Sequence, residues 1–127
     1  MTANDDAIRI GSYGLGAFAL SIGVTLIVQE DTRMSSPGWR VALSWIPPEA
    51  WGAYLAVCGV GILLTIPFGA WKVLGAFTGA VAVAFLLRGM ASFIALTAPN
   101  ASGTAPQFYA AGALLYFAHG ITMMRRR

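Results

Sequence analysis

Arg88 is the residue whose type and position most clearly indicate chemistry, because it interrupts the hydrophobic run from Val73 to Ala98. A charge at the centre of a bilayer costs about 2.5–3.5 kcal/mol on insertion scales, so such a residue usually faces protein, water or a partner. Arg88 is therefore a candidate intramembrane polar site that lines an aqueous path or an inter-subunit contact. The alternative is a structural arginine that bonds backbone carbonyls or extends to the outer interface.

His119, the only histidine, is the second candidate polar site. It lies near the end of the last apolar segment, where an imidazole could titrate near neutral pH and relay protons. The alternative is a histidine whose ring is hydrogen-bonded in the core or at the interface. No second ligand accompanies it in the sequence, so we expect no metal site, and no motif predicts a cofactor.

The remaining polar residues argue against several classes of function. All the acids lie outside the apolar segments: Asp5, Asp6, Glu30, Asp31 and Glu49. Transport coupled to protons or cations typically uses a carboxylate inside the membrane, so a minimal transporter is disfavoured. Gly14-x-Gly16 has no following strand or lysine, and no serine has a base nearby. We therefore expect no enzymatic activity.

The elements that position these residues are long and apolar. Of the 127 residues, 57% are hydrophobic and only 10% are charged. Four segments, at about 8–28, 49–66, 71–98 and 107–124, can each cross a hydrocarbon core of about 30 Å as helices. A further segment at about 38–46 is too short to span. The sequence predicts a single all-α domain over 1–127, an integral membrane four-helix bundle with a short interfacial helix in its first outer loop.

Charges and tryptophans predict the orientation of these spans. Arg125–Arg127 and Lys72 fall on one side of a four-span protein, which predicts that both termini are cytoplasmic and that the protein resides in the cytoplasmic membrane. These positions make the basic residues topology signals, so lipid rather than nucleic acid is the expected partner. The expected anchors at the membrane interfaces are Trp39, Trp45, Trp51 and Trp71.

Small residues at helical spacing predict close helix packing. The third segment contains Gly75-x-x-x-Gly79 and then Ala84, and the fourth contains Gly112 and Gly120. Small side chains allow helix backbones to approach closely. In lipid, where the hydrophobic effect does not drive helices together, this close packing stabilises their association. Such patterns argue for packing, and more weakly for oligomerisation.

Short motifs along nearly the whole chain resemble those of small four-span membrane proteins encoded by tailed phages and prophages. The matching features are Tyr13-Gly14-Leu15, Ser36-Pro37-Gly38-Trp39, Pro48-Glu49-Ala50-Trp51-Gly52, the third-span Arg88, and Ser102-Gly103-Thr104 with Tyr109. Some members of that group are treated as holin-like because they accompany lysis genes. The resemblance implies no catalytic residue.

Two functions are consistent with these features. One is a holin-like protein that forms homo-oligomers in the cytoplasmic membrane and permeabilises it. The other is an accessory or assembly subunit that packs against a larger membrane protein complex. Small size, several spans and small-residue faces fit both.

Overall fold

The computed structural model describes residues 3–28, 37–97 and 105–126, and all secondary structure in these parts is helical. The elements are α1 (Ala3–Val28), α3 (Pro37–Trp45), α4 (Pro48–Thr65), α5 (Trp71–Ile94), the 3-10 turn η1 (Ala95–Thr97) and α6 (Ala105–Met124). The predicted all-α class is confirmed. Each expected segment coincides with a helix, although α1 begins five residues before the expected span and α5 gives way to η1 at its end.

A proline begins α4 and a glycine turn ends it. Pro48 lies in the first turn of α4, where its missing N–H is not needed. At the other end, Ala70 N–H donates to Thr65 O at 3.4 Å and Gly69 N–H donates to Ile66 O at 3.2 Å. Gly69 has a φ of +64°, which a side chain would disfavour. These two bonds form a Schellman motif, which reverses the chain and begins α5 at Trp71.

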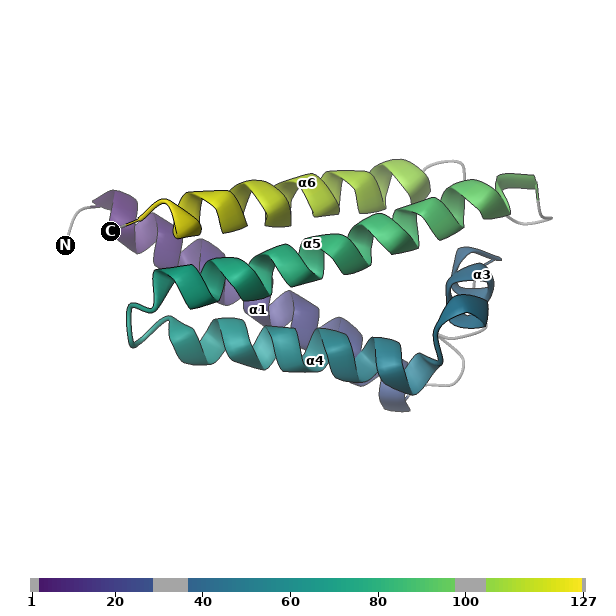
Figure 1. Ribbon diagram of the computed structural model, residues 1–127, viewed down its shortest axis with the longest axis horizontal. Helices are drawn as coiled ribbons and strands as arrows, with labels where there is room; N and C mark the ends of the chain where they lie inside the picture. The colour runs from purple at the N-terminus through teal and green to yellow at the C-terminus, as the bar shows by residue number, and fades with distance from the viewer. Residues whose placement is uncertain (1–2, 29–36, 98–104, 127) are drawn as a thin grey trace.

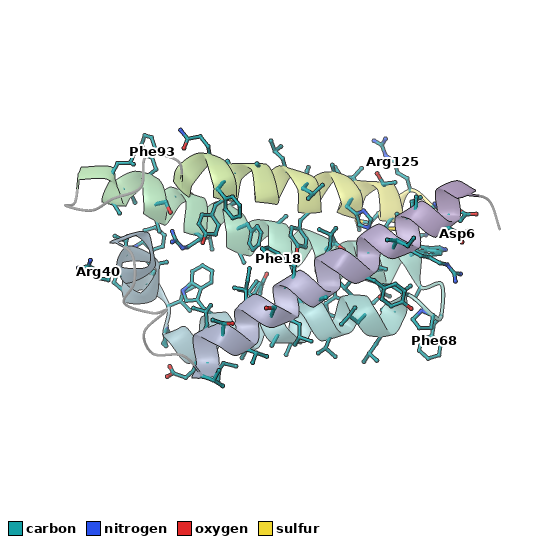
Figure 2. All side chains as sticks on the ribbon, turned by 180° about the vertical axis from the view of Figure 1, so that it is seen from behind. Asp6, Phe18, Arg40, Phe68, Phe93 and Arg125 are labelled. Carbon is teal, nitrogen blue, oxygen red and sulfur yellow. The ribbon has the colours of Figure 1, made fainter. Side chains whose placement is uncertain are left out.

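The four long helices form two tightly packed pairs, α1 with α4 and α5 with α6 (Figure 1). Glycines make the α1–α4 contact backbone to backbone. A Cβ added at Gly23 would lie 2.5 Å from the Ala56 nitrogen, and one added at Gly59 would lie 2.6 Å from the Leu20 nitrogen. Only glycine therefore permits the close approach at Gly23 and Gly59. Helix α1 crosses the other helices obliquely, as the view from behind shows (Figure 2).

In the α5–α6 pair, the close approach lies at Gly75 and Gly120. A Cβ at Gly75 would lie 2.8 Å from Gly120 O and 2.6 Å from Met124 Cγ, whereas a Cβ at Gly79 would meet nothing within 4 Å. Of the predicted Gly75–Gly79 pair, only Gly75 is thus sterically restricted: the Gly79 backbone still lies near α6, with its nitrogen 3.4 Å from a Cβ added at Gly120, but a Cβ on Gly79 itself would meet open space. Gly112 accommodates the ring of Phe85, whose Cδ2 would lie 2.5 Å from an added Cβ.

Helix α3 lies across the end of the bundle and packs on α5 and η1 (Figure 1). Its Ala42 is fully buried, while Arg40 and Trp45 are exposed. The indole Nε1 of Trp51 on α4 donates to Ala42 O at 3.1 Å. This bond fixes the short helix to the start of α4. The side chain of Trp39 lies outside the described residues.

The outer surface of the helices is strongly apolar. Only 28% of the apolar stretch of α1 is buried, and 50% of that of α5. Large apolar side chains that are more than half exposed include Ile10, Val28, Val57, Leu64, Phe68, Phe93, Leu114 and Leu115. Within the described residues, α1 (from Asp5) and α5 are long and apolar enough to cross a membrane. Helix α4 is shorter, and α6 is not among the qualifying helices, so length and hydropathy support two of the four expected spans.

Candidate functional site: the seam between the helix pairs

The two helix pairs meet along an interface that differs in chemistry from the contacts inside each pair. We call this interface the seam; its residues are Ser12, Leu15 and Phe18 of α1, Trp51 of α4, Phe85, Arg88 and Ser92 of α5, and Tyr109, Tyr116 and His119 of α6. Inside the pairs, glycines bring backbones together. Across the seam, the hydrogen bonds Ser12–His119 and Tyr116–Leu15 and the ring contact Phe18–Phe85 join α1 to the α5–α6 pair. Most polar side chains buried in the described structure lie here.

Arg88 lies near one end of the seam and is 4% exposed. Its Nη1 donates to Ser92 Oγ, one turn later on the same helix. The guanidinium carbon lies 4.3 Å from the centroid of the Tyr109 ring on α6, which is a cation–π contact. The arginine is therefore directed into the bundle, one turn after the small residue Ala84, and its surroundings include a hydroxyl and an aromatic face.

The space beside Arg88 is almost closed. A cavity of about 10 Å³ is bounded by side chains of four helices: Ile22, Trp51, Leu55, Ala84, Phe85 and Tyr109. A cavity needs at least about 10–15 Å³ of such volume to hold one water molecule. Among the described residues, Arg88 is therefore enclosed by neighbouring side chains in this conformation. The expected packing residue Ala84 is buried against this small cavity.

A second, wider opening lies next to the Arg88 cavity. A groove of about 280 Å³ between α1 and α6 is lined by Ser21, Thr25, Phe108 and others, and it shares Ile22 and Tyr109 with the Arg88 cavity. Ile22 and Tyr109 therefore separate the buried guanidinium from the groove. Movement of these two side chains would connect the two spaces.

His119 lies toward the opposite end of the seam and is held by α1. Its Nε2 is 2.7 Å from Ser12 Oγ, and which atom donates depends on the imidazole tautomer. Ser12 is fully buried. This contact supplies the hydrogen-bond partner that a structural histidine requires. Arg88 and His119 are thus in the same seam, each bonded to a serine.

Aromatic residues fill the seam between these two polar points. The ring of Phe85 makes edge-to-face contacts with Phe18, Tyr109 and Tyr116, at centroid distances of 6.1, 5.9 and 5.1 Å. The Tyr116 hydroxyl donates to Leu15 O at 2.7 Å, which adds a second bond between α6 and α1. Phe85 and Tyr116 were not predicted as site residues. For Tyr116 the sequence offers one signal: its spacing from Tyr109 and His119 puts all three residues on one face of α6.

The tryptophans expected at the membrane interfaces have different environments. Trp51 is only 3% exposed, because α3 covers it and accepts its hydrogen bond, so it is a core residue of the seam. Trp45 is exposed on α3, and Trp71 is half-buried at the other end of the bundle. There Arg126 pairs with Asp5, and its guanidinium carbon lies 5.0 Å from the Trp71 ring centroid.

Comparison with known proteins gives no relative for this chain: no family model, curated protein sequence or solved structure matches it. The function must therefore be argued from the helices, their surface and the seam.

Proposed function

We propose that this protein is a multi-span integral membrane protein whose four long helices cross the bilayer, with α3 in the outer interface. The observation that supports this is the apolar exterior, since apolar side chains on every long helix face outward. In water such a surface would drive association or aggregation. In a bilayer it is the expected lipid-facing surface, and the polar groups collect inside at the seam.

The charges support an orientation with both termini in the cytoplasm. Arg9, Lys72, Arg125 and Arg126 lie toward the end of the bundle that contains the α4–α5 turn and the C-terminus. Positively charged residues near the ends of spans are retained on the cytoplasmic side. Helix α3, with Arg40 and Trp45 exposed, then lies at the opposite interface of the cytoplasmic membrane.

Within this topology, the function that the seam supports best is holin-like permeabilisation of the membrane by an oligomer. Each helix pair is fixed by backbone contacts at glycine, whereas the pairs are joined by side-chain contacts such as Ser12–His119 and Tyr116–Leu15. Separation of the pairs would break these side-chain contacts, the Tyr54–Ala80 hydrogen bond, the Arg126–Asp5 ion pair and the packing of α3 on α5. It would expose Ser12 on one pair and Arg88, Ser92 and His119 on the other, and water can hydrate all four.

Such an opening gives Arg88 a definite role. In the closed form the guanidinium is held by Ser92 and Tyr109 next to a cavity with room for at most one water molecule. In the open form it would line the hydrated face, and several copies arranged with these faces inward would surround a path. Arg88 would keep its contacts with Ser92 and Tyr109, which lie within the α5–α6 pair, and water would hydrate the side of the guanidinium that faces α1 and α4 in the closed form. The resemblance to phage-encoded four-span proteins supports the same function.

The alternative function is that of an accessory subunit in a larger membrane complex, and one surface feature favours it. A groove of about 390 Å³ on the lipid-facing side of α5 and α6 is lined by Ala82, Val83, Leu86, Ala110, Ala113, Leu114 and Phe117. Alanines at its base would allow the helix of another protein to approach closely. A subunit of this kind would have no activity of its own.

Reconstitution distinguishes the two functions. Purified protein is incorporated at increasing protein-to-lipid ratios into vesicles that contain a small fluorescent dye. A holin-like protein releases the dye above a threshold ratio, because the path forms only in an oligomer. An accessory subunit leaves the vesicles sealed at every ratio and co-purifies from cells with one stoichiometric membrane partner, and that pair of results would overturn the proposal.

A further inference from the structure

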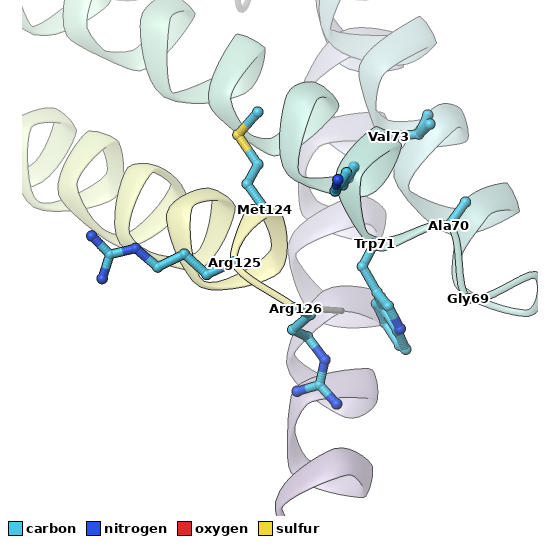
Figure 3. A pocket seen from close by; sticks show the side chains of 8 residues that line it. Gly69, Ala70, Trp71, Val73, Met124, Arg125 and Arg126 are labelled. Atoms are coloured by element: carbon cyan, nitrogen blue, oxygen red, sulfur yellow. The ribbon is translucent and has the colours of Figure 1, made fainter.

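A cavity of about 580 Å³ lies where the α4–α5 turn meets the C-terminal end of α6 (Figure 3). Its charged lining residues are Lys72, Arg125 and Arg126, and no acid lines it within the described part of the chain. Trp71 and Met124 provide an apolar side. The cavity is distinct from the seam, and the permeabilisation proposed above makes no use of it.

Contacts at the edge of the cavity hold part of this cationic cluster in place. Arg126 is fixed by its ion pair with Asp5 and by its position over the Trp71 ring. Figure 3 shows Arg126 next to Trp71, with Arg125 extending to the other side. Lys72 and Arg125 are exposed, and Arg9 of α1 also approaches Trp71, with its guanidinium carbon 6.0 Å from the ring centroid. Two cations, Arg9 and Arg126, thus contact Trp71, and two more, Lys72 and Arg125, line the cavity beside it.

The backbone adds to the positive potential. Helix α5 begins at Trp71, and its N-terminus has no side-chain cap. Backbone N–H groups at the start of a long helix attract anions, and here they lie beside Lys72. A cluster of cations with an uncapped helix start favours a ligand that carries a phosphate.

We propose that this cavity binds the phosphate of an anionic phospholipid headgroup in the inner leaflet. The inference rests on the membrane topology proposed above, which puts this end of the bundle at the cytoplasmic interface. A lipid fits better than a soluble anion because the cations border an apolar surface. Val73, Met124 and Phe68 are each about half exposed or more, and acyl chains could lie against them. Tryptophan and basic residues are also the side chains that favour an anionic interface.

The test uses the full chain in a neutral detergent, titrated with phosphatidylglycerol, phosphatidylcholine or inorganic phosphate. Retention of each ligand is measured by native mass spectrometry. The variants are Lys72→Gln, Arg125→Gln and the double variant, and the matched control is Arg40→Gln, which removes an exposed arginine at the opposite end. All of these side chains are exposed, so the fold is preserved. Thermal unfolding without lipid checks this.

We expect phosphatidylglycerol to bind more tightly than phosphatidylcholine. Each single variant at the cavity should weaken its binding roughly 5-fold, and the double variant roughly 25-fold, as expected for about one basic contact each. Arg40→Gln should bind like the wild type. Equal binding by the double variant, or equal loss in Arg40→Gln, would overturn the proposal. Inorganic phosphate that binds as well as the lipid would overturn the assignment of the ligand to lipid.

If the membrane proposal itself is wrong, the result is different: alkaline carbonate would release the protein from cell membranes, whatever their lipid composition. Failure of the headgroup site alone would leave the protein in the membrane but without preference for the anionic lipid.

Discussion

Ser12 on α1 and His119 on α6 are 107 positions apart in the sequence, yet Ser12 Oγ lies 2.7 Å from His119 Nε2. With Tyr116 Oη, which donates to Leu15 O, this bond ties the first helix to the last. The two bonds lie on successive turns of α1. They make the seam a line of side-chain contacts between two units that are each fixed by glycine.

The first prediction concerns this bond. Ser12→Ala removes the hydroxyl that bonds the part-buried His119 imidazole, so the free energy of unfolding should fall by about 1 kcal/mol, the usual scale for hydrogen bonds between membrane helices. Thermal unfolding in detergent measures the change. Ser21→Ala is the control because Ser21 is exposed on the same helix. Equal effects of the two substitutions on the free energy of unfolding would show that the Ser12–His119 bond does not stabilise the protein.

The α5–α6 contact predicts opposite effects at two glycines. Gly75→Ala introduces a Cβ 2.8 Å from Gly120 O and 2.6 Å from Met124 Cγ, so it should destabilise the protein by about 1–3 kcal/mol, the usual cost of overpacking. Gly79→Ala meets open space and should be neutral or stabilise by about 0.5–1 kcal/mol through the lower backbone entropy of alanine. Destabilisation of similar size at both positions would contradict this geometry.

A parallel comparison tests the α1–α4 pair. A Cβ at Gly23 would lie 2.5 Å from the Ala56 nitrogen and 2.7 Å from Gly52 O, and neither backbone atom can move alone. Gly23→Ala should therefore lower the unfolding temperature clearly. Gly14→Ala on the same helix, where nothing lies within 4 Å, should leave it unchanged or raise it. If Gly23→Ala proves as stable as wild type, α1 and α4 do not touch at this turn.

Arg88 should be dispensable for folding but required for permeabilisation. Arg88→Leu replaces a buried charge with an apolar group, a change that is often neutral or stabilising, so the unfolding temperature should hold or rise. Dye release from vesicles should be lost, because the hydrated face would lose its charge. Arg88→Lys retains the charge but not the planar guanidinium over Tyr109, so we expect partial release. Full dye release by a well-folded Arg88→Leu protein would leave Arg88 with a structural role only.

The helices themselves could be predicted because their signals are local. Apolar runs define their extents, and residues such as Pro48 and Gly69 mark where the chain turns. The inward orientation of Arg88 was also predictable, because a charge in an apolar run usually faces protein and Arg88 lies one turn after the small residue Ala84. Each of these features can be predicted from the sequence of a single helix.

The pairing of the helices could not be predicted, because small residues occur on all four and any two could have matched. Whether the α5–α6 contact is centred on Gly75 or Gly79 depends on the crossing angle, which one helix does not determine. Trp51 resembled an interface anchor by its position near a helix start. Its burial follows from the placement of α3 over it, which is a tertiary contact. The bond between Ser12 and His119 likewise required knowledge of where α1 crosses α6.

The central claim is that the seam opens while each helix pair stays intact, and cross-linking tests it most directly. In a Cys58→Ala background, Ser12→Cys with His119→Cys would be joined by a short reducible thiol cross-linker across the seam. The control, Ala82→Cys with Ala113→Cys, joins α5 to α6 within one pair, where both residues line one groove. Seam cross-linking should abolish dye release from vesicles and reduction should restore it, while the control remains active. Undiminished release by the protein with a fully cross-linked seam would contradict the claim.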